Sequence, residues 1–279
     1  MLRLRYAEGA TPRAGSKVNE WLDDSGEVLV QAFSREDLHW IEWRGVGTFA
    51  FSAGSQEVQV WPESGIRRET IVDIFDRTLQ PILLQALGES QALHASAAVA
   101  SAGVLAFCGR SGSGKSTLAF ALQQVGCQQF ADDALVLRLD GNRVIARPLP
   151  FMHRLRPQSR AHFERADELV SPKLDTADLP LAAVFLLQQD DSLVRARISL
   201  VPQLRAFTEV LSHAHCFDPA DPEHTRRLAK DYLELTSRVP VFALTYPPDF
   251  RQLPQLIQTV AAAVANFKAG IVFPCAALG

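Results

Sequence analysis

The chain has 279 residues, of which 47% are hydrophobic, so it can bury one large core, or a large core and a small one. Its formal net charge is −3 and it has no run of lysine or arginine, which argues against partners such as nucleic acid or an anionic membrane. The four cysteines are far apart, the N-terminus lacks the apolar run of a signal peptide, and no window of about eighteen residues is wholly apolar, so we expect a reduced, cytoplasmic protein.

Residues 1–68 are predicted to form a β-rich region. Short apolar runs with β-branched and aromatic residues lie at 27–34, 38–45, 48–54 and 57–63, separated by polar or glycine breaks. This region can bind an acceptor peptide by strand addition, although core packing explains its aromatic residues equally well.

Residues 69–279 are predicted to form one α/β domain. Apolar residues recur at helical spacing over 69–87, and Pro81 is expected to kink or divide that helix. Strands are predicted at 93–100 and 104–109. The short connection between them allows only an antiparallel hairpin.

A glycine-rich loop follows the second of these strands, and a helix is predicted from 115 to 125. A second hairpin is predicted over 134–149, with its turn at Asp140-Gly141. The loop therefore lies between two antiparallel features, which is unusual for folds wound wholly from βαβ units. The later predicted elements are a strand at 181–188, helices at 202–213 and 223–237, a strand at 239–246 and a helix at 253–267.

The loop, GRSGSGKS at 109–116, matches the pattern G-x-x-x-x-G-K-[ST] in full. Glycines let successive backbone N–H groups point at a phosphate, and the following helix adds its positive end. Lys115 is expected to reach the β- and γ-phosphates, and the Ser116 hydroxyl to bind Mg²⁺. The predicted nucleotide-binding residues are Gly109, Arg110, Ser111, Gly112, Ser113, Gly114, Lys115, Ser116 and Thr117.

Two adjacent carboxylates, Asp132 and Asp133, precede the next apolar run. Neighbouring residues on an extended chain point to opposite faces, so one can face an acceptor hydroxyl and the other the metal. An acidic surface turn is the alternative. His94 begins the strand that leads into the loop, where it can tune an aspartate or bond a phosphate; the alternative is a buried histidine bonded to backbone.

These features converge on a family. Residues 93–137, LHASAAVASAGVLAFCGRSGSGKSTLAFALQQVGCQQFADDALVL, resemble the catalytic domain of HPr kinase/phosphorylase. They are more similar still to HPr-kinase-like proteins of bacterial peptide-biosynthesis clusters, including lasso-peptide precursor kinases. The resemblance implies ATP- and Mg²⁺-dependent kinase chemistry on a serine hydroxyl. By position it makes Asp132 the base, Asp133 the metal-side carboxylate and His94 a helper. Related HPr kinases form oligomers, so a homo-oligomer is compatible with it.

The chain departs from HPr kinase in three places, one of which is its N-terminal region, which looks unlike that of HPr kinases. The family's apolar signature segment, which is involved in acting on HPr, is missing, and residues 140–157 stand in its place. Thr117 occupies a position where HPr kinases tend to carry glutamate. The missing segment argues against HPr as the substrate and against phosphorolysis. In the replacing segment, Arg154 is the preferred candidate to stabilise charge on the γ-phosphoryl group, and Arg156 is the second candidate. The alternative is that both lie on solvated surface.

The sequence thus predicts an α/β protein whose mixed-sheet P-loop kinase core, of the HPr kinase and phosphoenolpyruvate carboxykinase-like type, follows a small β-rich region. The predicted function is transfer of the γ-phosphoryl group of ATP to a serine or other hydroxyl of a peptide, with a ribosomal natural-product precursor as the acceptor that the resemblance implies. A kinase of a free amino acid, small molecule or carrier protein is one alternative. A nucleotide-dependent ATPase switch is the other.

Overall fold

The computed structural model describes residues 2–23, 25–150, 155–163 and 177–269. Its internal contacts divide the chain into two compact units. Unit 1 consists of Met1–Gln91 and His215–Leu228, and unit 2 consists of Ala92–Ala214 and Ala229–Gly279. This division differs from the predicted boundary at residue 68, because the helical segment that follows the β-rich region packs with that region.

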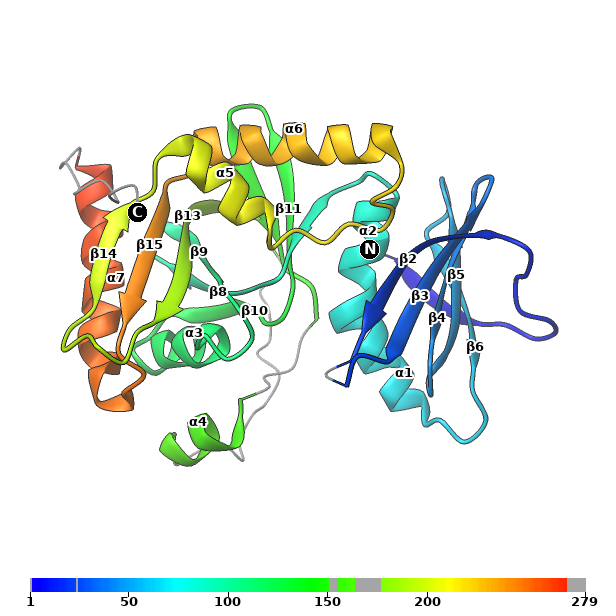
Figure 1. Cartoon of the computed structure of the whole chain (residues 1–279), viewed down its shortest axis with the longest axis horizontal. Helices are drawn as coiled ribbons and strands as arrows, with labels where there is room; N and C mark the ends of the chain where they lie inside the picture. The colour runs from blue at the N-terminus through cyan, green and yellow to red at the C-terminus, as the bar shows by residue number, and fades with distance from the viewer. Residues whose placement is uncertain (1, 24, 151–154, 164–176, 270–279) are drawn as a thin grey trace. The chain divides into compact units, whose positions relative to one another are not determined.

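Unit 1 contains a six-stranded sheet with the strand order β1-β6-β5-β4-β3-β2 (Figure 1). All neighbouring strands are antiparallel except β1 and β6, which are parallel. The four predicted strands correspond to β3–β6. The strands β1 and β2 were not predicted, because RLRY and SKVNEWL carry too few apolar residues for a clear alternation. The strands are β1 (Arg3–Tyr6), β2 (Ser16–Leu22), β3 (Val28–Arg35), β4 (Leu38–Trp43), β5 (Gly47–Ser52) and β6 (Glu57–Pro62).

The helical segment that follows β6 is divided, as Pro81 predicted. It consists of α1 (Arg68–Ile74), a π-helical turn (Phe75–Leu79) and α2 (Gln80–Ala86). The Gln80 N–H bonds to the Phe75 carbonyl, five residues back. Proline has no N–H and its ring clashes with the carbonyl four residues earlier, so the helix widens by one residue just before it.

Unit 2 is built on a nine-stranded mixed sheet (Figure 1). Its main path is β10-β8-β9-β13-β12-β11-β7, with β15 beside β13 and β14 beside β15. The strands are β7 (Gln91–Leu93), β8 (Ala95–Ala100), β9 (Gly103–Cys108), β10 (Gln128–Ala131), β11 (Leu135–Asp140), β12 (Arg143–Arg147), β13 (Leu179–Gln189), β14 (Arg197–Leu200) and β15 (Val241–Tyr246).

Both predicted hairpins are confirmed: β8 pairs with β9 and β11 with β12, each antiparallel. The strands β9, β13 and β15 are parallel to one another. Their carboxyl ends meet at one edge, since Cys108 pairs with Leu186 and Gln189 pairs with Tyr246. In open α/β sheets, ligands bind outside the carboxyl ends of the strands, so this edge is where a site is expected.

The core of unit 2 lies between this sheet and the helices α3 (Lys115–Gln124) and α7 (Leu253–Lys268). Phe107, Phe185 and Phe242 stack across the three parallel strands, with ring centroids 5.6 Å and 5.3 Å apart. Ala106 and Val184 directly precede Phe107 and Phe185, so their side chains point to the opposite face of the sheet. They are also fully buried, so both faces of the sheet are covered. The loop before α3 is thus held by strands that are fixed on both sides.

Three further helices complete the described part of the chain: α4 (Pro157–His162), α5 (Gln203–Leu211) and α6 (Pro222–Arg238). None of the helices in the described ranges is long and apolar enough to cross a membrane.

Candidate functional site

The glycine-rich loop joins the end of β9 to the start of α3. Gly109, Gly112 and Gly114 have φ values of +154°, +84° and +91°, which L side chains rarely adopt. A Cβ on Gly109 would also lie 2.8 Å from the Leu187 carbonyl oxygen of β13. The loop can therefore adopt this conformation because glycine occupies these positions.

Lys115 is folded back into this loop. Its Nζ donates to the main-chain oxygens of Gly109 at 2.8 Å and Arg110 at 3.3 Å. Only 7% of the residue is exposed, and this burial lowers the pKa of Lys115. Among the described residues, no carboxylate oxygen lies within 4.0 Å of Nζ. The ammonium is thus held at the loop without a directly paired anion.

Ser96 links Asp132 to Ser116 beneath the loop. The Ser96 hydroxyl is fully buried and donates to Asp132 Oδ1 at 2.7 Å. Ser96 Oγ also lies 3.4 Å from Ser116 Oγ, so Ser116 can donate to it. Asp132 is only 1% exposed. Three strands meet here, because β8 pairs with both β9 and β10.

Asp133 does not continue an extended strand. Its φ is +68°, in the left-handed region, and β10 has already ended at Ala131. The expectation that the two aspartates alternate on extended chain is therefore wrong. The turn buries Asp132 and leaves the partly exposed Asp133 on the wall of a cavity.

His94 lies in a break between β7 and β8, which corrects the single strand predicted over 93–100. Its N–H bonds to the His213 carbonyl, and its Nδ1 donates to the Asp133 carbonyl at 3.0 Å. Burial, with a smaller contribution from Lys115, lowers the pKa of His94. The imidazole is therefore neutral at pH 7, and its Nε2 is then an acceptor.

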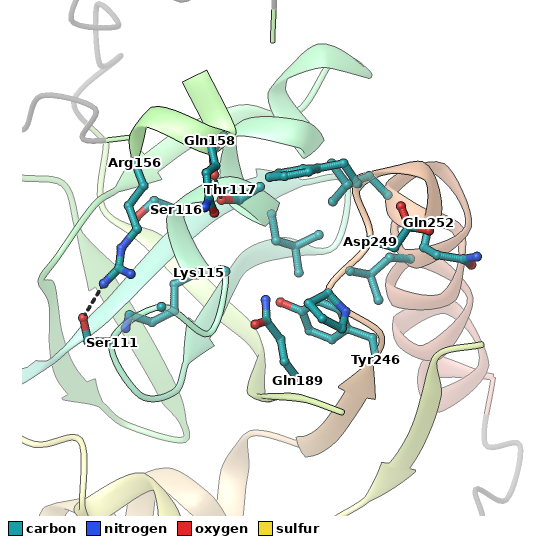
Figure 2. A pocket seen from close by; sticks show the side chains of 18 of the residues that line it. Ser111, Lys115, Ser116, Thr117, Arg156, Gln158, Gln189, Tyr246, Asp249 and Gln252 are labelled. Atoms are coloured by element: carbon teal, nitrogen blue, oxygen red, sulfur yellow. Dashed lines mark hydrogen bonds between the residues drawn. The ribbon is translucent and has the colours of Figure 1, made fainter. Parts of the chain in front are cut away.

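A cavity of about 290 Å³ opens at this edge of the sheet (Figure 2). It is lined by His94, Ser111, Gly112, Gly114, Lys115, Ser116, Thr117, Leu118, Asp133, Arg156, Gln158, Ser159, Gln189, Tyr246, Pro248, Asp249, Phe250, Gln252, Leu253 and Leu256. Six of the nine predicted loop residues therefore line the same cavity as His94 and Asp133, and Gly109, Arg110 and Ser113 are not among the lining residues. Asp132, which is also a predicted site residue, does not line the cavity and lies behind this wall.

Arg156 lies over the loop, where Figure 2 shows its guanidinium pointing toward Ser111. Its Nη2 donates to Ser111 Oγ at 2.9 Å, and its Nη1 would lie 3.2 Å from a Cβ on Gly112. The helix α4 that follows is tied to α3 by Thr117 and Ser159, whose hydroxyl oxygens are 2.8 Å apart. Arg154, the preferred arginine of the sequence analysis, lies outside the described residues.

Several lining residues were missed in the sequence. The Tyr246 hydroxyl donates to the Ser113 main-chain oxygen, and burial raises the pKa of Tyr246 to about 12, so the phenol stays protonated and holds the loop. Gln189 ends β13 beside it. A polar residue at the end of an apolar strand is the sequence signal that could have found both residues. FLLQQ ends in Gln189, and FALTY ends in Tyr246.

The site suits a metal that is bound together with phosphate. In the described part of the chain, no three His, Cys, Asp or Glu side chains gather as a metal cluster. Ser116, Asp132 and Asp133 offer oxygen ligands, which Mg²⁺ prefers, and Mg²⁺ usually completes its shell with water and substrate phosphates. The residues therefore fit a Mg²⁺–nucleotide complex better than a metal held by protein alone.

Comparison with known proteins finds similar solved structures but no similar sequence family. No protein-family model and no curated protein matches the chain. Among solved structures, the chain is similar to the Hpr(Ser) kinase/phosphatase from Coxiella burnetii, with 13% identity and a TM-score of 0.37. The match covers 64% of this chain and 99% of that one.

Proposed function

We propose that unit 2 is a P-loop kinase that transfers the γ-phosphoryl group of ATP to a hydroxyl acceptor. The observation that carries the proposal is the position of Lys115. It is a buried ammonium in a glycine-rich loop, at the carboxyl end of a parallel strand, and it faces the cavity that Asp133 and His94 also line.

The loop supplies the phosphate site of this proposal. Its glycines expose backbone N–H groups, α3 presents its positive end, and Lys115 supplies a full charge. A buried cation without a paired carboxylate is unfavourable, and an anionic phosphate would remove that penalty. The Ser113 hydroxyl, buried with no partner among the described residues, is a further donor at the same place.

Ser116 and Asp132 are proposed to hold Mg²⁺. They lie on either side of the Ser96 hydroxyl, which fixes Asp132 in place. When bound with the nucleotide, Mg²⁺ would neutralise phosphate charge.

Asp133 is proposed as the base that accepts the proton of the attacking hydroxyl. It lines the cavity, whereas Asp132 lies behind the cavity wall, where Ser96 connects it to Ser116 on the metal side. This assignment reverses the order that the resemblance implied. His94 bonds the main chain of Asp133 and fixes the turn that presents its carboxylate. A positioned base of this kind contributes about 10²–10⁴-fold to a rate.

Arg156 is proposed to stabilise charge on the transferred group. Its guanidinium lies beside Ser111 and Gly112, on the side of the loop that faces the cavity. Arginine supplied in this way lowers the barrier to phosphoryl transfer by matching the phosphoryl oxygens with planar donors.

For the acceptor, we propose a serine of a peptide, with a ribosomal natural-product precursor as the lead. Support from the structure is limited to unit 1, where β1 and β2 are the outer strands of the six-stranded sheet and can pair with an extended chain. The alternatives are a free amino acid, a small molecule or a carrier protein. An ATPase switch would use the same loop and pass the phosphate to water.

The test incubates the full chain with Mg²⁺–ATP and separated peptide and small-molecule fractions of its source cells. Mass spectrometry then looks for a phosphoryl group added to a serine or another hydroxyl. We expect a phosphorylated product with the wild type and none with Lys115→Ala. Free phosphate as the main product in every fraction would support the ATPase switch instead.

A further inference from the structure

The six-stranded sheet of unit 1 has two outer strands, β1 and β2, which differ in regularity (Figure 1). The pairing of β2 with β3 shifts its register twice, between Lys17 and Asn19 and between Trp21 and Leu22. Bulges of this kind twist an edge strand and interrupt its row of main-chain groups, which protects it against a further strand. The pairing of β1 with β6 has no shift over Arg3–Tyr6. Of the two edges, β1 is therefore the one that suits the addition of another strand.

The main chain of β1 directs alternate residues toward its open edge. In a parallel pair, a residue points both its N–H and its C=O to the same side, and the sides alternate along the strand. The Arg3 N–H bonds to the Gln56 carbonyl oxygen at 2.7 Å, so the odd-numbered positions of β1 face β6. The main-chain groups of Leu4 and Tyr6 therefore point to the open edge, where they have no hydrogen-bond partner among the described residues. Free groups of this kind are the ones that an added strand bonds.

One face of β1 is basic. Arg3 and Arg5 alternate with apolar residues and are both exposed, and β1 contains no acidic residue. The Arg5 guanidinium lies 3.1 Å from a carboxylate oxygen of Glu57, with 66% and 53% of the two side chains exposed. An exposed pair of this kind is weak, so Arg5 can exchange this partner for another carboxylate.

The other face of β1 is apolar and partly open. Leu4 is half-buried and Tyr6 is 37% exposed, so the side chain of an added strand can pack beside each of them. The Arg68 guanidinium lies 4.9 Å from the centre of the Tyr6 ring, which holds the ring in place and adds a further positive charge near this edge.

A second copy of β1 would be a poor occupant of this edge. Antiparallel pairing of two β1 strands would bring Arg3 and Arg5 of both copies together on one face. Like charges across a strand pair are destabilising. An acidic strand would meet the same arginines favourably, so charge selects the kind of partner.

We propose that β1 binds an acidic, extended segment of the acceptor peptide by strand addition. Its acidic side chains lie beside Arg3 and Arg5, and its apolar side chains lie on the face of Leu4 and Tyr6. Because successive residues of a strand point to opposite faces, the segment is one in which acidic and apolar residues alternate. The inference rests on the proposed function, which takes a peptide as the acceptor, and it adds the edge that binds this peptide and the chemistry that is recognised.

The test measures the binding of fluorescent synthetic peptides to the full chain by anisotropy, without nucleotide. The probe is a short peptide of alternating glutamate and valine, and the matched peptide has lysine in place of glutamate. We expect the acidic peptide to bind more tightly, and its affinity to fall with added salt. Arg3→Glu and Arg5→Glu should each weaken it by about 3–10-fold, because an attraction becomes a repulsion. Lys17→Glu, the matched reversal on β2, should leave it unchanged.

A second pair of variants tests the main-chain contacts. Tyr6→Pro removes one N–H at the open edge and keeps the bonds to β6, which come from the odd-numbered residues. Tyr6→Ala is its control, because it also loses the ring but keeps the N–H. We expect Tyr6→Pro to bind the acidic peptide more weakly than Tyr6→Ala does, and thermal unfolding checks that both are folded. An acidic peptide that is N-methylated at alternate residues should also lose affinity, and it requires no change in the protein.

Three outcomes would overturn the inference. The first is equal affinity for the acidic and basic peptides. The second is binding that depends on the arginines but is insensitive to N-methylation, which would indicate a contact of charges without strand addition. The third is self-association of the chain that Tyr6→Pro abolishes, which would assign the edge to a second copy.

The proposed function is tested separately from this inference. Lys115-dependent phosphoryl transfer without binding of the acidic peptide would overturn the inference alone. Binding of the acidic peptide as expected, with no phosphoryl transfer to any hydroxyl, would overturn the proposed function and with it the role of the bound peptide as an acceptor.

Discussion

Each of the two units buries a basic side chain, and they satisfy it in different ways. In unit 1, Arg77 is 5% exposed and pairs with Asp73 one helical turn away, with Nη2 and Oδ2 3.0 Å apart. In unit 2, Lys115 is 7% exposed, and its hydrogen bonds within the described part of the chain go to carbonyl oxygens of its own loop. The first charge is neutralised within the fold, and the second is positioned for an anion from outside.

This difference separates a structural charge from a functional one. Removing one partner of a buried ion pair leaves the other uncompensated and destabilises the fold. A buried cation that lacks a counter-charge already lowers stability, so its removal should affect ligand binding more than folding.

Lys115→Ala should reduce phosphoryl transfer to background, because the main cation at the phosphates is lost. Its thermal midpoint should stay at the wild-type value or rise. Arg77→Ala is the matched variant: it should lower stability by about 1–3 kcal/mol and leave transfer intact in the folded fraction. Activity assays and thermal unfolding of both proteins check the contrast. An inactive Arg77→Ala with an active Lys115→Ala would overturn it.

Asp133→Asn should lower turnover by about 10²–10⁴-fold while keeping Mg²⁺–ATP affinity, because it removes the base and leaves the metal side intact. Asp132→Asn should instead weaken Mg²⁺-dependent nucleotide binding. Titration with and without Mg²⁺, together with turnover, distinguishes the two carboxylates. The reverse pattern would restore the order that the family resemblance implied.

Arg156→Ala should lower turnover on the order of 10²-fold, below the effect of a dedicated arginine finger, because this side chain is exposed to water. Arg160→Ala, an exposed arginine on α4, the helix that follows Arg156, is the control and should be silent. Equal losses in both variants would point to a general effect of charge on α4 and not to a role at the phosphates.

Ser96→Ala should raise the Mg²⁺ concentration needed for half-maximal activity by about 10-fold, because a hydrogen bond to a charged group is worth about 1.5–3 kcal/mol. Its maximal turnover at saturating Mg²⁺ should change less. Ser90→Ala removes a buried hydroxyl with no partner among the described residues and serves as the control. An unchanged Mg²⁺ dependence in Ser96→Ala would show that Ser96 only fills space.

The loop could be predicted from sequence because its chemistry needs a fixed set of residues at fixed spacing. The two hairpins could be predicted because short turns such as Asp140-Gly141 permit one pairing. The role of Ser96 could not be predicted, because it depends on the strand register that places Ser96 beside Asp132 and Ser116. The left-handed turn at Asp133 was missed because an extended strand was assumed through both aspartates.

The division between units was missed for a related reason. Residues 68–86 have a clear helical period, but the period does not say which sheet the helix packs against. Residues 215–228 join unit 1 from far along the chain, for example where the Phe217 N–H donates to Gln85 Oε1 at 3.0 Å. Long-range contacts of this kind leave no local signal.

We propose that a phosphoryl group bound by the loop at Lys115 passes to a hydroxyl. The most direct measurement follows ADP and inorganic phosphate release from Mg²⁺–ATP, with and without the acceptor fraction. We predict that the acceptor accelerates ADP release without a matching rise in free phosphate, and that Lys115→Ala abolishes this. Equal release of ADP and phosphate, independent of any acceptor, would contradict the account.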